Sequence, residues 1–219
     1  GSEMCIRDSL YTPGNTSGYP SEKVKSGIRF YFLGGAEEVG NVGCIIEDNT
    51  GTRLLIDYGM APTRPPRYPS ESPPVSDAII THSHIDHIGM APWLVGAHGT
   101  KLHGTELTAK VSEIMWRDTY KVSSIEKYPL SWDKRDLDLA LDSWETHKIG
   151  ESFNIGEWNC KFHLAGHMPG AVMVEINTPS ARILWTGDID TRNSPNVIGA
   201  SPISCDISVS YTHLRAHET

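Results

Sequence analysis

Short apolar segments alternate with polar turns along this chain, and their lengths predict a mixture of strands and helices. Segments rich in β-branched and aromatic residues predict strands at 28–33, 43–47, 53–56, 78–81 and 101–104, and again at 152–155, 157–163, 171–177 and 182–186. Between these groups, 106–120 predicts an amphipathic helix whose apolar stripe is Leu107, Val111, Ile114 and Met115. A second, more polar helix is expected at 133–141. Strands, then helices, then strands again predict an α/β sandwich.

The stretch from Thr81 to His87 is the richest in chemistry, because His82, His84, Asp86 and His87 fall within six positions. It follows a predicted buried strand and precedes a segment that can begin a helix. His82 and His84 point the same way if the chain stays extended between them. Imidazole and carboxylate groups together suit zinc, and other first-row metals less selectively. The alternative is a polar surface loop, but turn chemistry alone does not favour three His and one Asp in this order.

The spacing H-x-H-x-D-H resembles the signature of the metallo-β-lactamase superfamily. That signature implies a later lone His and, about 20 residues beyond it, an Asp after a hydrophobic strand. Gly166-His167 and Leu184-Trp185-Thr186-Gly187-Asp188 match both in the expected order. The resemblance implies a four-layer αββα sandwich, incomplete at its C-terminus, with metal ions at one edge of two facing sheets.

The same resemblance implies a metal-ligand set. His82, His84 and His167 would hold a first ion with an open position for water, as in catalytic zinc sites. Asp86, His87 and Asp188 would hold a second ion, with Asp188 able to bridge both, so Asp86 and Asp188 are the candidate catalytic residues. Two ions roughly 3.5–4 Å apart can activate water for hydrolysis without a covalent enzyme intermediate. Taken singly, His167 could be a packing residue and Asp188 a turn residue.

Other polar positions have weaker assignments. Asp57 ends a predicted strand and resembles the superfamily's first-motif Asp, which orients a ligand His from behind; simple turn capping is the alternative. Four further His are expected to be surface or packing residues, because none has a partner at metal spacing that the main set does not already use. These are His98, His103, His147 and His163.

Composition limits the remaining classes. The chain has 219 residues and a formal charge of −8, which argues against a generally basic nucleic-acid surface. No apolar run approaches the length of a membrane span, and residues 1–7 lack the apolar segment of a signal peptide. The four scattered Cys predict free thiols in a reducing compartment, and therefore a cytoplasmic location.

Five local motifs resemble the β-CASP nucleases, in particular the archaeal relatives of the cleavage and polyadenylation factor endonuclease. The motifs are L-G-G-A-E-E-V-G from Leu33, L-I-D-Y-G-M from Leu55, the histidine turn with M-A-P-W-L from Met90, A-G-H-M-P-G-A from Ala165, and W-T-G-D-I-D from Trp185. The resemblance covers about 28–207. It implies hydrolysis of RNA phosphodiesters with two zinc ions, and it allows a homodimer of the full-length protein.

The ends of the chain depart from that branch. We expect an irregular lead-in at 1–27, a partial metallo-β-lactamase domain at 28–207 and a non-native tail at 208–219, because both ends resemble translated sequencing-adapter read-through. His213 and His217 are accordingly not assigned to the metal site. The branch's acidic motif after Ile207 and its β-CASP domain, with a further ligand His and the presumed general acid, are not found. The sequence therefore predicts a fragment that is inactive alone. A self-contained hydrolase of thioesters, lactones or β-lactams and a non-catalytic RNA-processing subunit remain alternatives.

Overall fold

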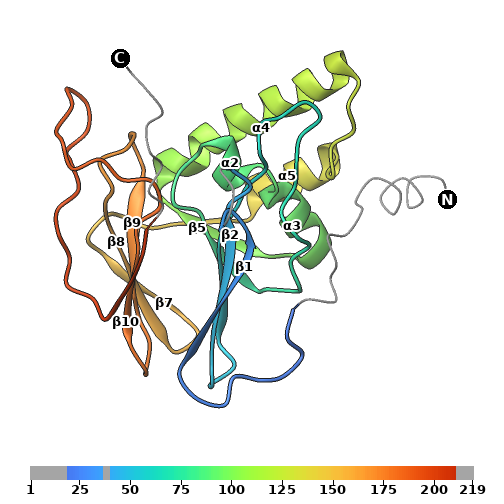
Figure 1. Ribbon diagram of the computed structural model, residues 1–219. Helices are drawn as coiled ribbons and strands as arrows, with labels where there is room; N and C mark the ends of the chain where they lie inside the picture. Colours follow the sequence, from blue (N-terminus) through green and yellow to red (C-terminus); the bar gives the residue numbers. More distant parts are fainter. Residues whose placement is uncertain (1–18, 37–39, 211–219) are drawn as a thin grey trace.

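Two β-sheets lie face to face in the computed structural model, with the helices gathered on one side (Figure 1). The structure describes residues 19–36 and 40–210. The predictions for 1–18 and 211–219 therefore lie outside the described residues. The first sheet has the order β1-β2-β3-β4-β5-β6: Ile28–Gly34, Gly43–Asp48, Arg53–Tyr58, Asp77–Ile79, Lys101–Gly104 and Trp144–Thr146. The second has the order β11-β10-β9-β8-β7: Ile207–Val209, Arg182–Trp185, Val172–Asn177, Trp158–Leu164 and Ser152–Ile155.

The central strands of the first sheet are buried on both faces. Its antiparallel half, β1 to β3, continues into the parallel strands β4, β5 and β6. All six residues of β2 are buried, as expected of a strand that is covered on both sides. The outer face packs against α3 (Ala91–His98), α4 (Glu106–Glu126) and α5 (Lys134–Asp142).

The inner faces of the two sheets share one apolar core. Alternate residues of β2, β3, β8, β9 and β10 meet there: Cys44, Ile46, Leu54, Ile56, Phe162, Val174, Ile176, Ile183 and Trp185 are among them. Cys44 and Cys160 are buried in this core as free thiols, and burial raises the pKa of each to about 12. The predicted free thiols are confirmed for the three Cys of the described part, Cys44, Cys160 and Cys205.

The two-sheet α/β sandwich predicted from the sequence is confirmed. The described part of the chain has no helix after α5, and the outer face of the second sheet packs instead against the segment between β10 and β11. There Ala165, Met173 and Leu184 are buried against Met168, Ala200 and Ile203. No described helix combines the length and the apolarity that crossing a bilayer requires.

Two short strands escaped prediction. β6 and β11 have three residues each, which is too short for a periodic pattern to indicate a strand. β11 pairs in parallel with β10, so the expected domain boundary at residue 207 falls inside this strand.

The predicted apolar stripe of the first helix is wrong for Leu107 and Ile114, although Met115 does pack against the core. α4 also continues beyond residue 120 to Glu126. Leu107 and Ile114 are 42% and 66% exposed, whereas Trp116 is fully buried. The buried face consists mainly of small polar residues, Thr108, Ser112 and Ser123, around that single indole. The Trp116 Nε1–H donates to the carbonyl of Ile88 over 2.9 Å, which fixes the rotation of the helix. Burial of one large aromatic side chain, rather than of a longer row of aliphatic ones, therefore determines which face of α4 packs against the core.

Candidate metal centre

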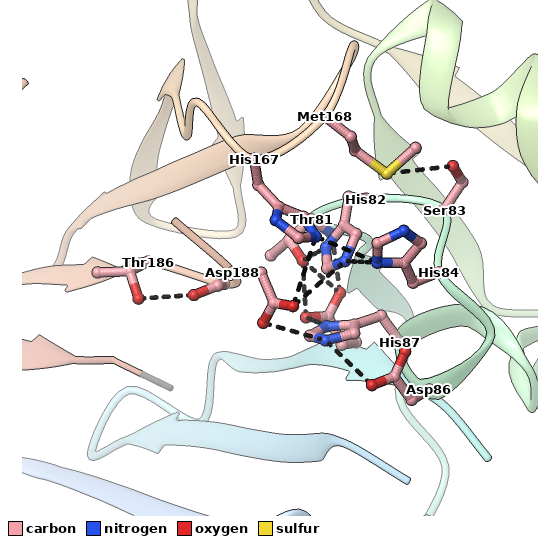
Figure 2. A network of polar contacts seen from close by, with 12 residues as sticks. Thr81, His82, Ser83, His84, Asp86, His87, His167, Met168, Thr186 and Asp188 are labelled. Atoms are coloured by element: carbon pink, nitrogen blue, oxygen red, sulfur yellow. Dashed lines mark hydrogen bonds and ion pairs between the residues drawn. The ribbon is translucent and has the colours of Figure 1, made fainter. Parts of the chain in front are cut away.

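Three chain segments meet at one edge of the sandwich and bring the predicted site residues together (Figure 2). The histidine turn follows β4 and leads into the short helix α2 (Ile85–Ile88). His167 lies in the loop between β8 and β9, and Asp188 follows β10. The two sheets therefore supply ligating groups from opposite sides of the same edge.

One group of donor atoms could surround a single ion. His84 Nδ1 lies 3.1 Å from His82 Nε2 and 3.2 Å from His167 Nε2. Asp188 Oδ2 lies 3.9 Å from His82 Nε2 and 3.6 Å from His167 Nε2, and all four donors are within 4.8 Å of one another. Two nitrogens on a tetrahedral zinc ion with bonds of 2.0–2.1 Å would be about 3.3 Å apart. The donor set therefore fits one ion in both chemistry and spacing.

The second group lies around His87. Its Nε2 atom is 3.5 Å from Asp188 Oδ1 and 4.0 Å from Asp86 Oδ2. Asp188 thus directs one oxygen toward His87 and the other toward His82 and His167, as Figure 2 shows. All six predicted ligand residues are brought together, and Asp188 lies between the two groups.

Asp57 holds the histidine turn from behind. This fully buried carboxylate accepts the Thr81 N–H at Oδ1 over 2.8 Å and the Thr81 hydroxyl at Oδ2 over 2.8 Å. Oδ2 also lies 2.8 Å from His87 Nδ1, so this ring nitrogen carries a proton. Nε2 is the atom that faces the two aspartates, and it becomes available to a metal ion when it loses its own proton. The carboxylate is oriented by a left-handed backbone at Asp57, where φ is 55°, a conformation that Asp tolerates better than most residues.

Thr81 is the residue that sequence reasoning missed. Its hydroxyl gives its proton to Asp57 and accepts one from His82 Nδ1, 3.1 Å away. His82 Nε2 is then left with its lone pair directed toward His84. One buried aspartate therefore sets two tautomers, that of His87 directly and that of His82 through Thr81. The sequence feature that could have indicated this role is the hydroxyl residue immediately before the first His of the motif.

We expect Thr81→Val, which keeps the side-chain volume, to weaken the affinity of the group formed by His82, His84 and His167 for added Zn²⁺ about 10–100-fold. The physical reason is that His82 loses the acceptor that fixes its tautomer. Competition with a zinc-binding dye measures this affinity. Thr100→Val is the matched control, because the Thr100 hydroxyl is also buried but bonds the carbonyl of Val75, away from the histidine turn. Equal losses in the two variants would contradict this role for Thr81.

The turn itself is too short to hold its shape alone, so the surrounding fold supports it. α2 has four residues, far fewer than an isolated helix needs. The indole N–H groups of Trp116 and Trp132 donate to the carbonyls of Ile88 and Gly89 over 2.9 and 2.8 Å, satisfying the C-terminal end of the helix. A Cβ on Gly59 would collide with the Asp86 carbonyl group, so only glycine permits this close approach to the turn.

The carboxylates dominate the electrostatics of the site. Burial lowers the pKa of His87, but the charge of Asp57 and hydrogen bonds with Asp188 and Asp57 outweigh burial and raise the pKa to about 10. Burial also lowers the pKa of His167, and Asp188 opposes this effect only in part. The low pKa favours the neutral imidazole, which is the form that binds a metal. The site as a whole favours a cation.

The remaining histidines of the described residues divide into two pairs. His98 Nε2 contacts the carbonyl of Ser72, and His163 Nε2 contacts Glu175, so these two side chains have ordinary polar partners. The expectation that His103 and His147 lack partners at metal spacing is wrong, because their ring nitrogens lie 3.0 Å apart. Sequence spacing could not show this contact, since 44 positions separate the two residues.

The comparisons with known proteins agree with the fold. The family model of the metallo-β-lactamase superfamily matches residues 37–201, more than half of the chain. The chain belongs to the metallo-β-lactamase superfamily. A Cronobacter sakazakii metallo-β-lactamase resembles it with a TM-score of 0.50 and 14% identity, over 76% of this chain and 64% of that chain. A protein of unknown function from Enterococcus faecalis resembles it with a TM-score of 0.53 and 14% identity, over 74% of this chain and 43% of that chain. At these identities the likeness shows the fold alone.

Several curated relatives carry names of ribonucleases and RNA-cleavage factors. The "RNase aCSPSF2" of Saccharolobus solfataricus is 30% identical over 72% of this chain and 32% of its own length. An "RNase J-like protein" of Methanocaldococcus jannaschii is 29% identical over 81% of this chain and 40% of its own length. "Cleavage and polyadenylation specificity factor 73" of Drosophila melanogaster is 26% identical over 84% of this chain and 28% of its own length. The chain thus spans between about a quarter and two fifths of the length of these relatives.

Proposed function

We propose that this chain is the metal-binding domain of a two-zinc ribonuclease of the β-CASP branch, which hydrolyses RNA phosphodiesters. The observation that carries the proposal is the group formed by His82, His84, His167 and Asp188, whose donor atoms lie within 4.8 Å of one another. The names of the ribonuclease relatives support RNA as the substrate class. A homodimer of the full-length protein and a cytoplasmic location stay predictions.

The proposal gives each residue a role. His82, His84 and His167 would hold the first zinc ion; Asp86 and His87 would hold the second, and Asp188 would bridge them. Bound ions would supply Lewis-acid activation of water and of a phosphoryl oxygen. The protein's own contribution is orientation: Asp57 and Thr81 fix the ring tautomers, and the two buried indoles fix the turn that carries the ligands.

The two ions should differ in affinity. The first group offers three nitrogens and one carboxylate oxygen, whereas the second offers one nitrogen and the oxygens of Asp86 and Asp188. The branch's further ligand His and general acid would belong to the part of the relatives that this chain does not span. Loss of acid–base catalysis alone typically lowers rates 10²–10⁴-fold.

We therefore expect the 219-residue chain to hold close to one zinc ion firmly and to release the second on mild chelation. It should cleave RNA little or not at all. Metal analysis by mass spectrometry before and after dialysis against a weak chelator measures the first property, and a labelled-RNA assay measures the second. Two tightly held ions together with EDTA-sensitive cleavage would contradict the expected dependence on a further domain.

Substrate class is tested on the longest protein that the gene encodes. We expect EDTA-sensitive hydrolysis of end-labelled RNA, absent from an Asp188→Ala variant. The same preparation is offered a thioester, a lactone and a β-lactam. Hydrolysis of one of these without cleavage of RNA would replace the ribonuclease proposal by a small-substrate hydrolase. Full metal occupancy without hydrolysis of any of them would favour a non-catalytic subunit.

A further inference from the structure

We propose a second transition-metal site at the β6 end of the first sheet, formed by His103, His147 and Glu145. It shares no residue with the candidate metal centre described above. The three side chains offer two imidazole nitrogens and one carboxylate oxygen, and these atoms lie within 4.8 Å of one another. Such a donor set suits Zn²⁺ or Co²⁺.

Strand pairing brings the three residues together. β5 and β6 run in parallel, with His103 opposite Glu145 in the register. The backbone N–H of His147 then donates to the Gly104 carbonyl over 2.9 Å, which continues the pairing past the end of β6. As a result, His103 Nδ1 lies 3.0 Å from His147 Nε2, and His147 Nε2 lies 3.9 Å from Glu145 Oε1.

A carboxylate behind His103 sets its tautomer. Asp77 Oδ1 on β4 lies 2.9 Å from His103 Nε2, so that nitrogen carries the proton and donates it to the carboxylate. The lone pair of Nδ1 is then directed toward His147. Metal-ligating histidines commonly have this arrangement, with the second ring nitrogen hydrogen-bonded to a carboxylate.

The two imidazole rings and the Phe153 ring lie nearly parallel to one another. The His147 ring stacks on Phe153 with a centroid distance of 3.6 Å and an interplanar angle of 5°. The His103 and His147 rings are nearly parallel, at 11°, and burial lowers the pKa of His147, which favours its neutral form. The two nitrogens are 3.0 Å apart and the ring centroids 5.3 Å apart, so the nitrogens face each other along one line. A tetrahedral zinc ion would impose roughly 3.3 Å and converging lone pairs, so binding requires the His147 ring to tilt.

Glu145 is the adjustable ligand. Its side chain is 48% exposed and accepts a hydrogen bond from Lys101 Nζ over 2.8 Å, so a small rotation would exchange that surface contact for an ion. Water would complete the coordination. Such an ion would join β4, β5 and β6 through Asp77, His103 and Glu145, and it would stabilise the folded chain in proportion to its affinity.

A competing explanation accounts for the same distance without a metal: His147 Nε2–H could donate directly to His103 Nδ1. The two explanations differ in what added metal does, so the test uses a background in which only this site remains. The background is the tag-free chain carrying His82→Ala, His84→Ala and His167→Ala to remove the first ion group, and Asp86→Asn and Asp188→Asn to remove the second. His213→Gln and His217→Gln exclude the tail. Co²⁺ alone is the probe, followed by visible absorption, equilibrium dialysis and thermal unfolding.

We expect the background chain to bind one Co²⁺ and to unfold at a higher temperature when it is present. Asp77→Asn should weaken binding about 10–100-fold, and His147→Gln should weaken it at least as much. His163→Gln is the matched control: His163 also pairs with a carboxylate, Glu175 Oε2 at 2.8 Å, but contributes to no such group. The affinity of the His163→Gln variant for Co²⁺ should equal that of the background chain.

Two results would overturn the proposal. One is a background chain that is folded by circular dichroism yet binds no Co²⁺ at millimolar concentration. The other is binding that His147→Gln leaves unchanged. If His147→Gln does not fold, two other measurements test the proposal. They are Co²⁺ binding by the exposed Glu145→Gln variant and the imidazole NMR signals of the background chain. Signals of His103 and His147 that saturating Zn²⁺ does not shift would establish the direct hydrogen bond instead.

Discussion

Replacing Asp188 by Ala in the longest protein that the gene encodes is expected to abolish RNA hydrolysis while one zinc ion per chain is retained. Asp188 directs Oδ1 toward His87 Nε2 over 3.5 Å and Oδ2 toward His167 Nε2 over 3.6 Å. Without it the second group keeps only Asp86 and His87, whereas the first keeps three imidazoles. The second ion should therefore be lost and the first only weakened. Metal analysis and a labelled-RNA assay on the same preparation measure both effects.

Asp190→Ala is the matched control for this change, because Asp190 lies two residues further along the same loop and pairs with Arg192. Its metal content and activity should be close to those of the unchanged protein. Loss of both ions in Asp188→Ala would show that Asp188 is needed for the whole site and not chiefly for the second ion. Retention of both ions would remove Asp188 from the ligand set.

The second large effect concerns stability. Trp116→Ala is expected to lower the free energy of unfolding by about 3–5 kcal/mol, because it removes a fully buried indole from the core under the histidine turn. It also leaves the carbonyl of Ile88 without the donor at 2.9 Å. Zinc affinity should fall as well, since α2 carries Asp86 and His87. Urea denaturation and zinc competition measure the two changes.

Ile114→Ala on the same helix provides the comparison. Ile114 is 66% exposed, and Ala has the higher helix propensity, so the free energy of unfolding should change by no more than about 0.5 kcal/mol. Sequence periodicity alone predicted the opposite ranking, with Ile114 in the apolar stripe. Comparable losses in the two variants would contradict the orientation of α4 described here.

The sequence predicted the parts of the fold that local patterns determine. β5 and β7 match their predicted limits, 101–104 and 152–155, because each is a short run between clear turns. β6 and β11 were missed because three residues carry no periodicity, and only pairing with a neighbouring strand defines them. The face of α4 was wrong because a single Trp with a buried hydrogen-bond acceptor outweighed several aliphatic residues.

The site was predictable where spacing along the chain determines the geometry. His82, His84, Asp86 and His87 lie in one turn, and the order of His167 and Asp188 after it followed from the family resemblance. The role of Thr81 depends on hydrogen bonds and the pair His103–His147 on strand register, and spacing along the chain determines neither. Long-range contacts of this kind appear only when the sheets are assembled.

The most direct test of the central claim is a crystal structure of the zinc-loaded chain with anomalous diffraction at the zinc edge. The account predicts a peak about 2.0–2.1 Å from each of His82 Nε2, His84 Nδ1 and His167 Nε2. A second, weaker peak should lie between Asp86, His87 and Asp188. An ordered histidine turn with no anomalous peak among His82, His84 and His167 at saturating zinc would contradict the account.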